Sequence, residues 1–223
     1  MKILPALLEA TIDSFAAQLT RLTPHFDRFS IDIQDGKVIP STTISTSDIL
    51  EYFKSQPPVS ASPIFDFDLM TLDYEKALSD ISELKKYISI GNIVIFKAAL
   101  KGAHLPSHSD LVIGLSLDPP DTIEGLELEY NLNQVPCLQI MTIHAGPQGQ
   151  SFIPELLNKI DQAKSLGYGS QIYIDGAVNS SSLPTILGHK NVPDFACVGS
   201  YLTKAGDELE ERITFLKTSL REV

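Results

Sequence analysis

Acidic side chains lie at the ends of several strand-like stretches of this sequence. Asp32, Asp68 and Asp175 each come at or near the end of a short apolar or alternating run, and Asp175 is followed at once by a glycine that favours a turn. His144 follows a fourth such run. A single polar residue at a strand end means little. The same arrangement on several strands predicts a shared site, because the carboxyl ends of parallel strands meet at one edge of a sheet.

Carboxylates that converge in one site can transfer protons next to a carbonyl group. If one is ionised and the other protonated, a pair on opposite sides of a carbon can remove a proton from one face and return one to the other. A donor or a cation must then stabilise the negative charge that develops on the carbonyl oxygen. Three carboxylates together require a cation or a bound proton, because like charges in one site cannot all stay ionised.

Two glycine-containing turns are candidates for binding a phosphate group through backbone amides. Residues 146–149 follow the sixth expected strand and contain two glycines, and Gly199 and Ser200 lead from the last strand directly into a helix start. Eight-stranded α/β barrels often bind phosphate after their seventh and eighth strands. Ordinary turns have the same composition, so the pattern alone does not decide between a binding site and a simple loop.

The composition is that of one globular domain, and it narrows the range of partners. A chain of 223 residues matches one α/β barrel, and no run approaches the ~18 apolar residues of a membrane span. The net charge of −11 argues against nucleic acid or an anionic membrane as a partner, but turn amides can bind a small phosphorylated ligand without basic residues. Cys137 and Cys197 lie in apolar runs and are expected to be buried, reduced thiols.

Strand-like and helix-like stretches alternate along the chain. The run from Ile93 to Phe96 is continuously apolar, which fits a parallel strand covered on both faces. The expected strands are Ile3–Leu7, Arg28–Ile33, a strand that ends at Asp66–Leu69, Asn92–Ala98, Leu111–Leu117, Cys137–Ile143, Gln171–Ile174 and Phe195–Val198. The alternation predicts a parallel sheet. Eight such units predict a closed (β/α)₈ barrel, with an open doubly wound sheet as the alternative.

The chain resembles the ribulose-phosphate 3-epimerase family from end to end. The stretches that match the family, in order and spacing, are Leu4–Leu7, Ile31–Pro40, Phe65–Met70, Gly146–Pro154, Asp175–Val178 and Val198–Ser200. The resemblance implies one (β/α)₈ TIM-barrel domain of the ribulose-phosphate-binding type over residues 1–223. It also implies an isomerase that inverts the C3 centre of a ketopentose 5-phosphate through an enediolate. Asp32 and Asp175 would be its catalytic pair, assisted by a divalent metal.

Several positions depart from the family's motifs, and two of them concern the metal. Ser30 and Asp68 stand where the family has histidine ligands. The metal ligands would then be Asp32, Asp68 and Asp175, an all-oxygen set that favours Mg²⁺ or Mn²⁺ over Zn²⁺, and no organic cofactor is expected. Further replacements are Ala6 for a serine, Gln34 for a methionine, and Gln148 and Ala177 for loop glycines.

The resemblance also implies where a ligand would bind. The expected phosphate-binding residues are Gly146, Gln148, Gly149, Ala177, Gly199 and Ser200. The expected substrate-pocket residues are Ala6, Ser30, Gln34, Met70, Met141 and His144. His144 has two interpretations, a rim histidine bonded to backbone or a ligand or acid in the site. Asp66 lies one layer deeper than Asp68 and is expected to be a hydrogen-bonded structural carboxylate.

Two functions fit this pattern. The first is a metal-assisted epimerase of a phosphorylated ketose, favoured because Asp32 and Asp175 are both present. The second is a sugar-phosphate-binding barrel that has lost activity or acts on another substrate, favoured by the loss of both histidines. A decarboxylation or an aldol cleavage is a third hypothesis, and Lys97 is the lysine that the latter would use. The expected partner is a phosphorylated sugar, without nucleic acid or membrane, and the protein is expected to be a cytoplasmic homo-oligomer.

Overall fold

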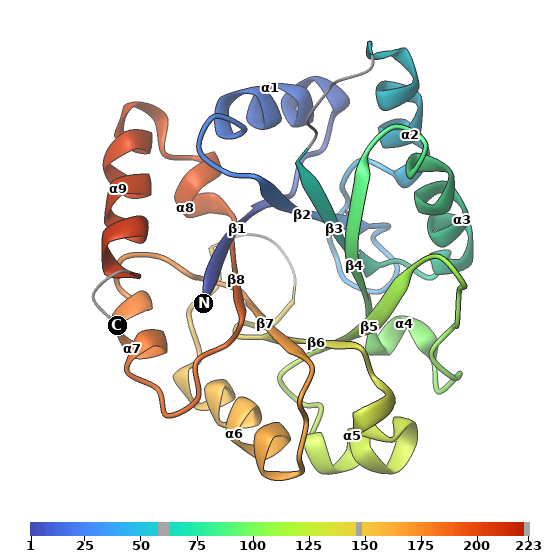
Figure 1. Cartoon of the computed structure of the whole chain (residues 1–223), viewed down its shortest axis with the longest axis vertical. Coiled ribbons are helices and arrows are strands. Elements are labelled where there is room, and N and C mark those ends of the chain that lie inside the picture. Colours follow the sequence, from blue (N-terminus) through green and yellow to red (C-terminus); the bar gives the residue numbers. More distant parts are fainter. Residues whose placement is uncertain (58–62, 146–148, 221–223) are drawn as a thin grey trace.

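Eight parallel strands close into a barrel in the computed structural model, and helices surround it (Figure 1). The structure describes residues 1–57, 63–145 and 149–220. The strands pair in sequence order, and β1 closes the barrel against β8. Their bounds are β1 (Lys2–Leu7), β2 (Arg28–Gln34), β3 (Ile64–Met70), β4 (Ser89–Phe96), β5 (Val112–Leu117), β6 (Cys137–Met141), β7 (Gln171–Asp175) and β8 (Phe195–Val198). The predicted (β/α)₈ barrel is therefore confirmed, and the open doubly wound alternative is wrong.

Helices follow the strands and form the outer ring of Figure 1. The α-helices are α1 (Ile12–Leu22), α2 (Thr46–Ser55), α3 (Tyr74–Leu84), α4 (Lys97–Leu100), α5 (Ile123–Tyr130), α6 (Asn158–Ser165), α7 (Leu183–Leu187), α8 (Ser200–Thr203) and α9 (Leu209–Ser219). Short 3₁₀ turns lie at Leu132–Gln134, Pro154–Leu157 and Gly206–Glu208. Side-chain caps set the start of α1 at Thr11 and of α5 at Thr122, where the hydroxyl accepts a backbone N–H three residues on. None of the described helices is long and apolar enough to span a bilayer.

Two strands end two residues earlier than expected from the sequence. β4 stops at Phe96, and Lys97 opens the one-turn helix α4. The apolar run ends at Phe96, and after Lys97 the residues Ala98 and Ala99 favour helix over strand. β6 stops at Met141 rather than Ile143, where its last ladder partner is Asp175. The shorter β6 leaves the residues that follow Met141 in the loop beyond the barrel.

The alternating pattern of β2 sorts its side chains between two environments. Phe29, Ile31 and Ile33 face outward and join the apolar core between barrel and helices. Ser30 and Asp32 have the opposite parity and are buried inside the barrel. The barrel therefore encloses a polar column, which an apolar shell surrounds.

A polar plug closes the end of the barrel where the strands begin. Arg28 donates two hydrogen bonds of 2.8 Å to the carboxylate of Asp66, and the backbone N–H of Asn92 donates a third of 2.6 Å. The Arg28 guanidinium also donates to the hydroxyl of Tyr173 at 2.9 Å and lies 4.5 Å above the ring of Phe195. Burial raises the pKa of Asp66, and the bonds from Arg28 partly offset this. The prediction that Asp66 is a structural carboxylate is confirmed.

Removing the cation of this plug should destabilise the barrel. Arg28→Met leaves the Asp66 charge buried without its partner, and losing one partner of a buried pair costs about 3–5 kcal/mol of unfolding free energy. Urea denaturation followed by circular dichroism measures the change. Lys54→Met is the control, because within residues 1–57, 63–145 and 149–220 the ion pairs of Lys54 are those with Glu51 and Glu83 at the surface, and their loss should change stability little. Equal midpoints for the two variants would contradict the role given to the plug.

Candidate active site

Three carboxylates meet inside the barrel near the carboxyl ends of its strands. Asp32 on β2 and Asp68 on β3 are ladder partners, and Asp175 is the last residue of β7. One oxygen from each lies within 4.8 Å of the others. The exposed fractions are 2% for Asp32, 1% for Asp68 and 9% for Asp175. The structure thus brings together the three aspartates that the sequence places at strand ends.

Hydrogen bonds satisfy this cluster only in part. Asp68 Oδ2 accepts a bond from the side-chain amide of Gln139 on β6, and that amide also donates to the hydroxyl of Ser116 on β5 at 3.2 Å. Among the described residues, Asp32 Oδ1 and Asp68 Oδ1 are buried without a hydrogen-bond partner. Unpaired buried oxygens are costly, so these atoms are free for a cation or a proton. The oxygen-only donor set fits a hard divalent metal such as Mg²⁺ or Mn²⁺.

Burial shifts the acidity of all three groups in the same direction. Desolvation is the largest cause and raises the pKa of Asp175 to about 6, although the Gly176 N–H lowers it in part. Burial together with the nearby charge of Asp175 raises the pKa values of Asp32 and Asp68 well above the usual range. A metal-free cluster therefore keeps its protons to a higher pH than ordinary aspartates do. Asp175, with a pKa near neutrality, is suited to both accept and donate one.

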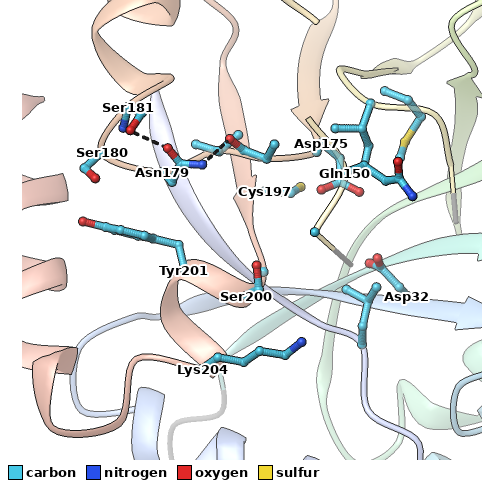
Figure 2. Close-up of a pocket in the computed structure, with 18 of the residues that line it drawn as sticks. Asp32, Gln150, Asp175, Asn179, Ser180, Ser181, Cys197, Ser200, Tyr201 and Lys204 are labelled. Carbon is cyan, nitrogen blue, oxygen red and sulfur yellow. Dashed lines mark hydrogen bonds between the residues drawn. The ribbon is translucent and has the colours of Figure 1, made fainter. Parts of the chain in front are cut away.

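A cavity of about 610 Å³ opens above the cluster, within the ~300–1,000 Å³ common for ligand pockets. Asp32 and Asp175 line it, whereas Asp68 lies behind them and does not. Figure 2 shows the two lining carboxylates reaching the cavity from β2 and β7. Cys197 also lines it, and burial keeps the pKa of this thiol well above its usual range, so the group is neutral. Both cysteines are free and buried, as predicted.

The predicted pocket residues divide into two groups. Gln34, Met70 and Met141 line the cavity. Ala6 and Ser30 are ladder partners on β1 and β2, are buried, and are not among the lining residues. Ser30 therefore does not occupy the place of a ligand at the cavity surface.

Two further candidates from the sequence lie away from the cavity. His144 follows Met141, the last residue of β6, by three positions; it is exposed and does not line the cavity. Lys97 forms ion pairs with Asp121 at 3.4 Å and Glu129 at 3.2 Å and is likewise not a lining residue. With these partners Lys97 is a charged residue at the end of β4, so the structure does not support a Schiff-base lysine in this cavity.

The predicted phosphate-binding residues that the structure describes all line the cavity: Gly149, Ala177, Gly199 and Ser200. Gly146 and Gln148 lie outside the described residues. The turn after β7 is left-handed at Gly176 (φ 118°) and Ala177 (φ 52°). A Cβ on Gly176 would lie 2.5 Å from Ile143, so only glycine fits there. Ala177, which the family resemblance puts in the place of a glycine, thus has a backbone conformation that glycine adopts more readily than alanine.

Several lining residues were not predicted from the sequence. They are Gln150, Asn179, Ser180, Ser181, Tyr201, Lys204 and Arg212. A signal was present for one of them, because Lys204 follows Ser200 by four residues and the segment from Ser200 to Thr203 is helical, which places both on one side of that turn. Arg212 on α9 comes to the cavity only through the packing of α9 beside α8, which no local pattern reveals.

Comparison with known proteins identifies the chain's relatives. Residues 2–202 match the model of the ribulose-phosphate 3 epimerase family. The chain belongs to this family. It is 25% identical to the ribulose-phosphate 3-epimerase of Methanocaldococcus jannaschii over 162 residues, which cover 71% of this chain and 65%, just under two thirds, of that protein. The enzymes of Helicobacter pylori (24% over 211 residues, 93% of each chain) and Escherichia coli (20% over 220 residues, 96% and 91%) match over more of their length.

Solved structures share the fold. The chain superposes on a 3-keto-L-gulonate-6-phosphate decarboxylase from Vibrio cholerae with a TM-score of 0.61 and 13% identity, covering 100% of this chain and 97% of that one. At this identity the likeness shows the barrel alone. Ribulose-phosphate 3-epimerases are isomerases that use a divalent metal, and the aspartate cluster of this family member could bind one.

The raised pKa values predict an inverted pH dependence of stability. In the unfolded chain aspartates titrate near ~3.9, so between about pH 4 and 6 the native cluster holds more protons than the unfolded chain does. The contribution of the cluster to the stability of the metal-free protein is therefore present below about pH 4 and is lost as the pH rises through 6. Thermal unfolding after chelation, measured from pH 4 to 8, should show this loss.

Asp68→Asn is the matched variant, because it removes one charge and keeps the shape. Its melting temperature should fall less steeply with pH than that of the wild type, because one ionisable group of the cluster is gone. The other carboxyl groups are the same in both proteins, so the difference between the two pH curves reports on the cluster. Mn²⁺ at pH 7 should raise the melting temperature of the wild type more than that of the variant. Parallel pH curves would contradict this account of the cluster.

Proposed function

We propose that the protein is a metal-assisted epimerase of a phosphorylated ketose, with Asp32 and Asp175 as the proton-transferring pair. The observation that carries the proposal is the position of these two carboxylates, which enter one cavity from β2 and β7. The cavity wall also includes Gly199 and Ser200, where the family resemblance puts the phosphate. A ketose phosphate would thus have its reactive carbon between the aspartates and its phosphate at the far wall.

The two lining aspartates divide proton removal and proton return between them, and Asp68 has a separate part. The ionised member of the pair removes the proton from the carbon next to the carbonyl, and the protonated member returns one to the opposite face. The pKa of about 6 lets Asp175 take either part near neutral pH. A divalent cation bound by the cluster would supply the positive charge that the enediolate oxygens need. Asp68 does not line the cavity, so its part is that of a ligand held in place by Gln139.

Turnover of ketose phosphates tests the proposal. A coupled assay with ribulose 5-phosphate and related ketose phosphates, with Mn²⁺, Mg²⁺ and Zn²⁺ added in turn, should show epimerisation supported best by Mn²⁺ or Mg²⁺. Asp175→Asn should lower kcat by roughly 10²–10⁴, as expected when a general acid or base is lost. Asp13→Asn is the control, because Asp13 is exposed on α1 and is not a lining residue of the cavity. Absence of turnover with every metal and substrate would overturn the proposal.

A sugar-phosphate-binding protein without turnover is the second candidate. Its support is that neither Ser30 nor Asp68 reaches the cavity surface, so the two family histidines have no replacement there. In that case a ketose phosphate would raise the melting temperature while no product formed. No thermal shift at millimolar ketose phosphate would count against this candidate.

A further inference from the structure

The wall of the cavity formed by α8 and α9 contributes two cations. Lys204 follows α8, and Arg212 lies on α9. The whole chain carries 17 basic against 28 acidic residues. Two basic residues on one wall of a cavity whose other charged groups are carboxylates therefore suit a ligand with an anionic group. The two differ in what they already bind.

Arg212 already has an acidic partner and a backbone partner within the protein. Its guanidinium donates to Glu208 Oε2 at 2.6 and 3.1 Å and to the backbone carbonyl of Tyr201 at 2.9 Å. It also lies 4.9 Å from the centre of the Tyr201 ring. Arg212 therefore links α9 to Tyr201 of α8, and the carboxylate of Glu208 largely offsets its charge.

The ammonium group of Lys204, in contrast, has no hydrogen-bond or ion-pair partner among the described residues, and only the backbone N–H of Lys204 is bonded, to Ser200. Its side chain runs into the cavity below Ser200 in Figure 2, with the ammonium group directed inward. No carboxylate oxygen of Asp32 or Asp175 lies within ion-pair distance of it. The cavity thus has a free positive group at one wall and a carboxylate cluster at another. A ligand with an anionic group at one end and a hydroxyketone at the other complements both.

By the family resemblance, Ala177 in the cavity wall stands where the family motif has a glycine. A lysine ammonium can add to the backbone amides a charge-assisted bond, which is about twice as strong as a neutral one. Its flexible stem lets it reach a phosphate from the rim. We propose that Lys204 is a specificity-determining residue that binds the ligand's phosphate and makes the cavity prefer phosphorylated over unphosphorylated sugars. This inference rests on the proposed function for the identity of the ligand.

Binding of inorganic phosphate tests the inference without any need for turnover. Calorimetry on the full-length protein should show that Lys204→Met weakens phosphate binding by roughly 10- to 100-fold, the range expected when a hydrogen bond to a charged group is lost. Lys204→Arg should keep most of the affinity. Lys190→Met is the control, because Lys190 is an exposed lysine without a described partner, just before β8 at the opposite end of the barrel. All variants should melt near the wild-type temperature.

Kinetics give a second readout where turnover is found. The loss in Lys204→Met should be larger in KM than in kcat for the ketose phosphate, and the preference over the unphosphorylated ketose should fall. Phosphate binding that is absent in the wild type, or equal in Lys204→Met and Lys190→Met, would overturn the inference. Lys204-dependent phosphate binding without epimerisation would instead overturn the proposed function and leave the role of Lys204 standing.

Discussion

Mutual repulsion of three buried carboxylates is the constraint on which the active end of this barrel depends. Asp32, Asp68 and Asp175 cannot all be ionised within 4.8 Å of one another in a desolvated space. Gln139 can satisfy one oxygen of Asp68 but brings no charge. The unbalanced charge therefore has to be met from outside the chain, by protons or by a cation. A site with this property changes its charge state whenever its occupant changes.

The two ends of the barrel solve the same electrostatic problem in opposite ways. At the closed end, Arg28 neutralises Asp66 and the pair is held by Asn92 and Tyr173. At the open end, no basic side chain of the described residues pairs with the aspartate cluster. Asp66 and Asp68 are two residues apart on β3, so one strand carries both a structural and a reactive carboxylate. The difference lies in the partners that neighbouring strands supply.

Much of this arrangement could be predicted from the sequence, because it follows from local period and from parallel topology. Eight alternating units predict a barrel, and aspartates at the carboxyl ends of its strands are expected on one face. What could not be predicted depends on contacts distant in sequence. Gln139 reads as a polar interruption of an apolar strand until Asp68, 71 residues away, is placed beside it. The sequence alone places His144 at the tip of β6, because the apolar run that ends at Ile143 does not show that the strand stops at Met141.

The ion pair between Arg28 and Asp66 has a consequence for strand alignment. A slip of β3 by two residues against β2 would keep every side chain on its own face, so the apolar shell would not resist it. The slip would place Asp66 opposite Asp32 and move Asp68 up to Gln34. It would also break the two 2.8 Å bonds from Arg28. The bonds from Arg28 thus favour the native register of β3 against β2, and a contact at the closed end of the barrel helps to set the spacing of the reactive carboxylates at the open end.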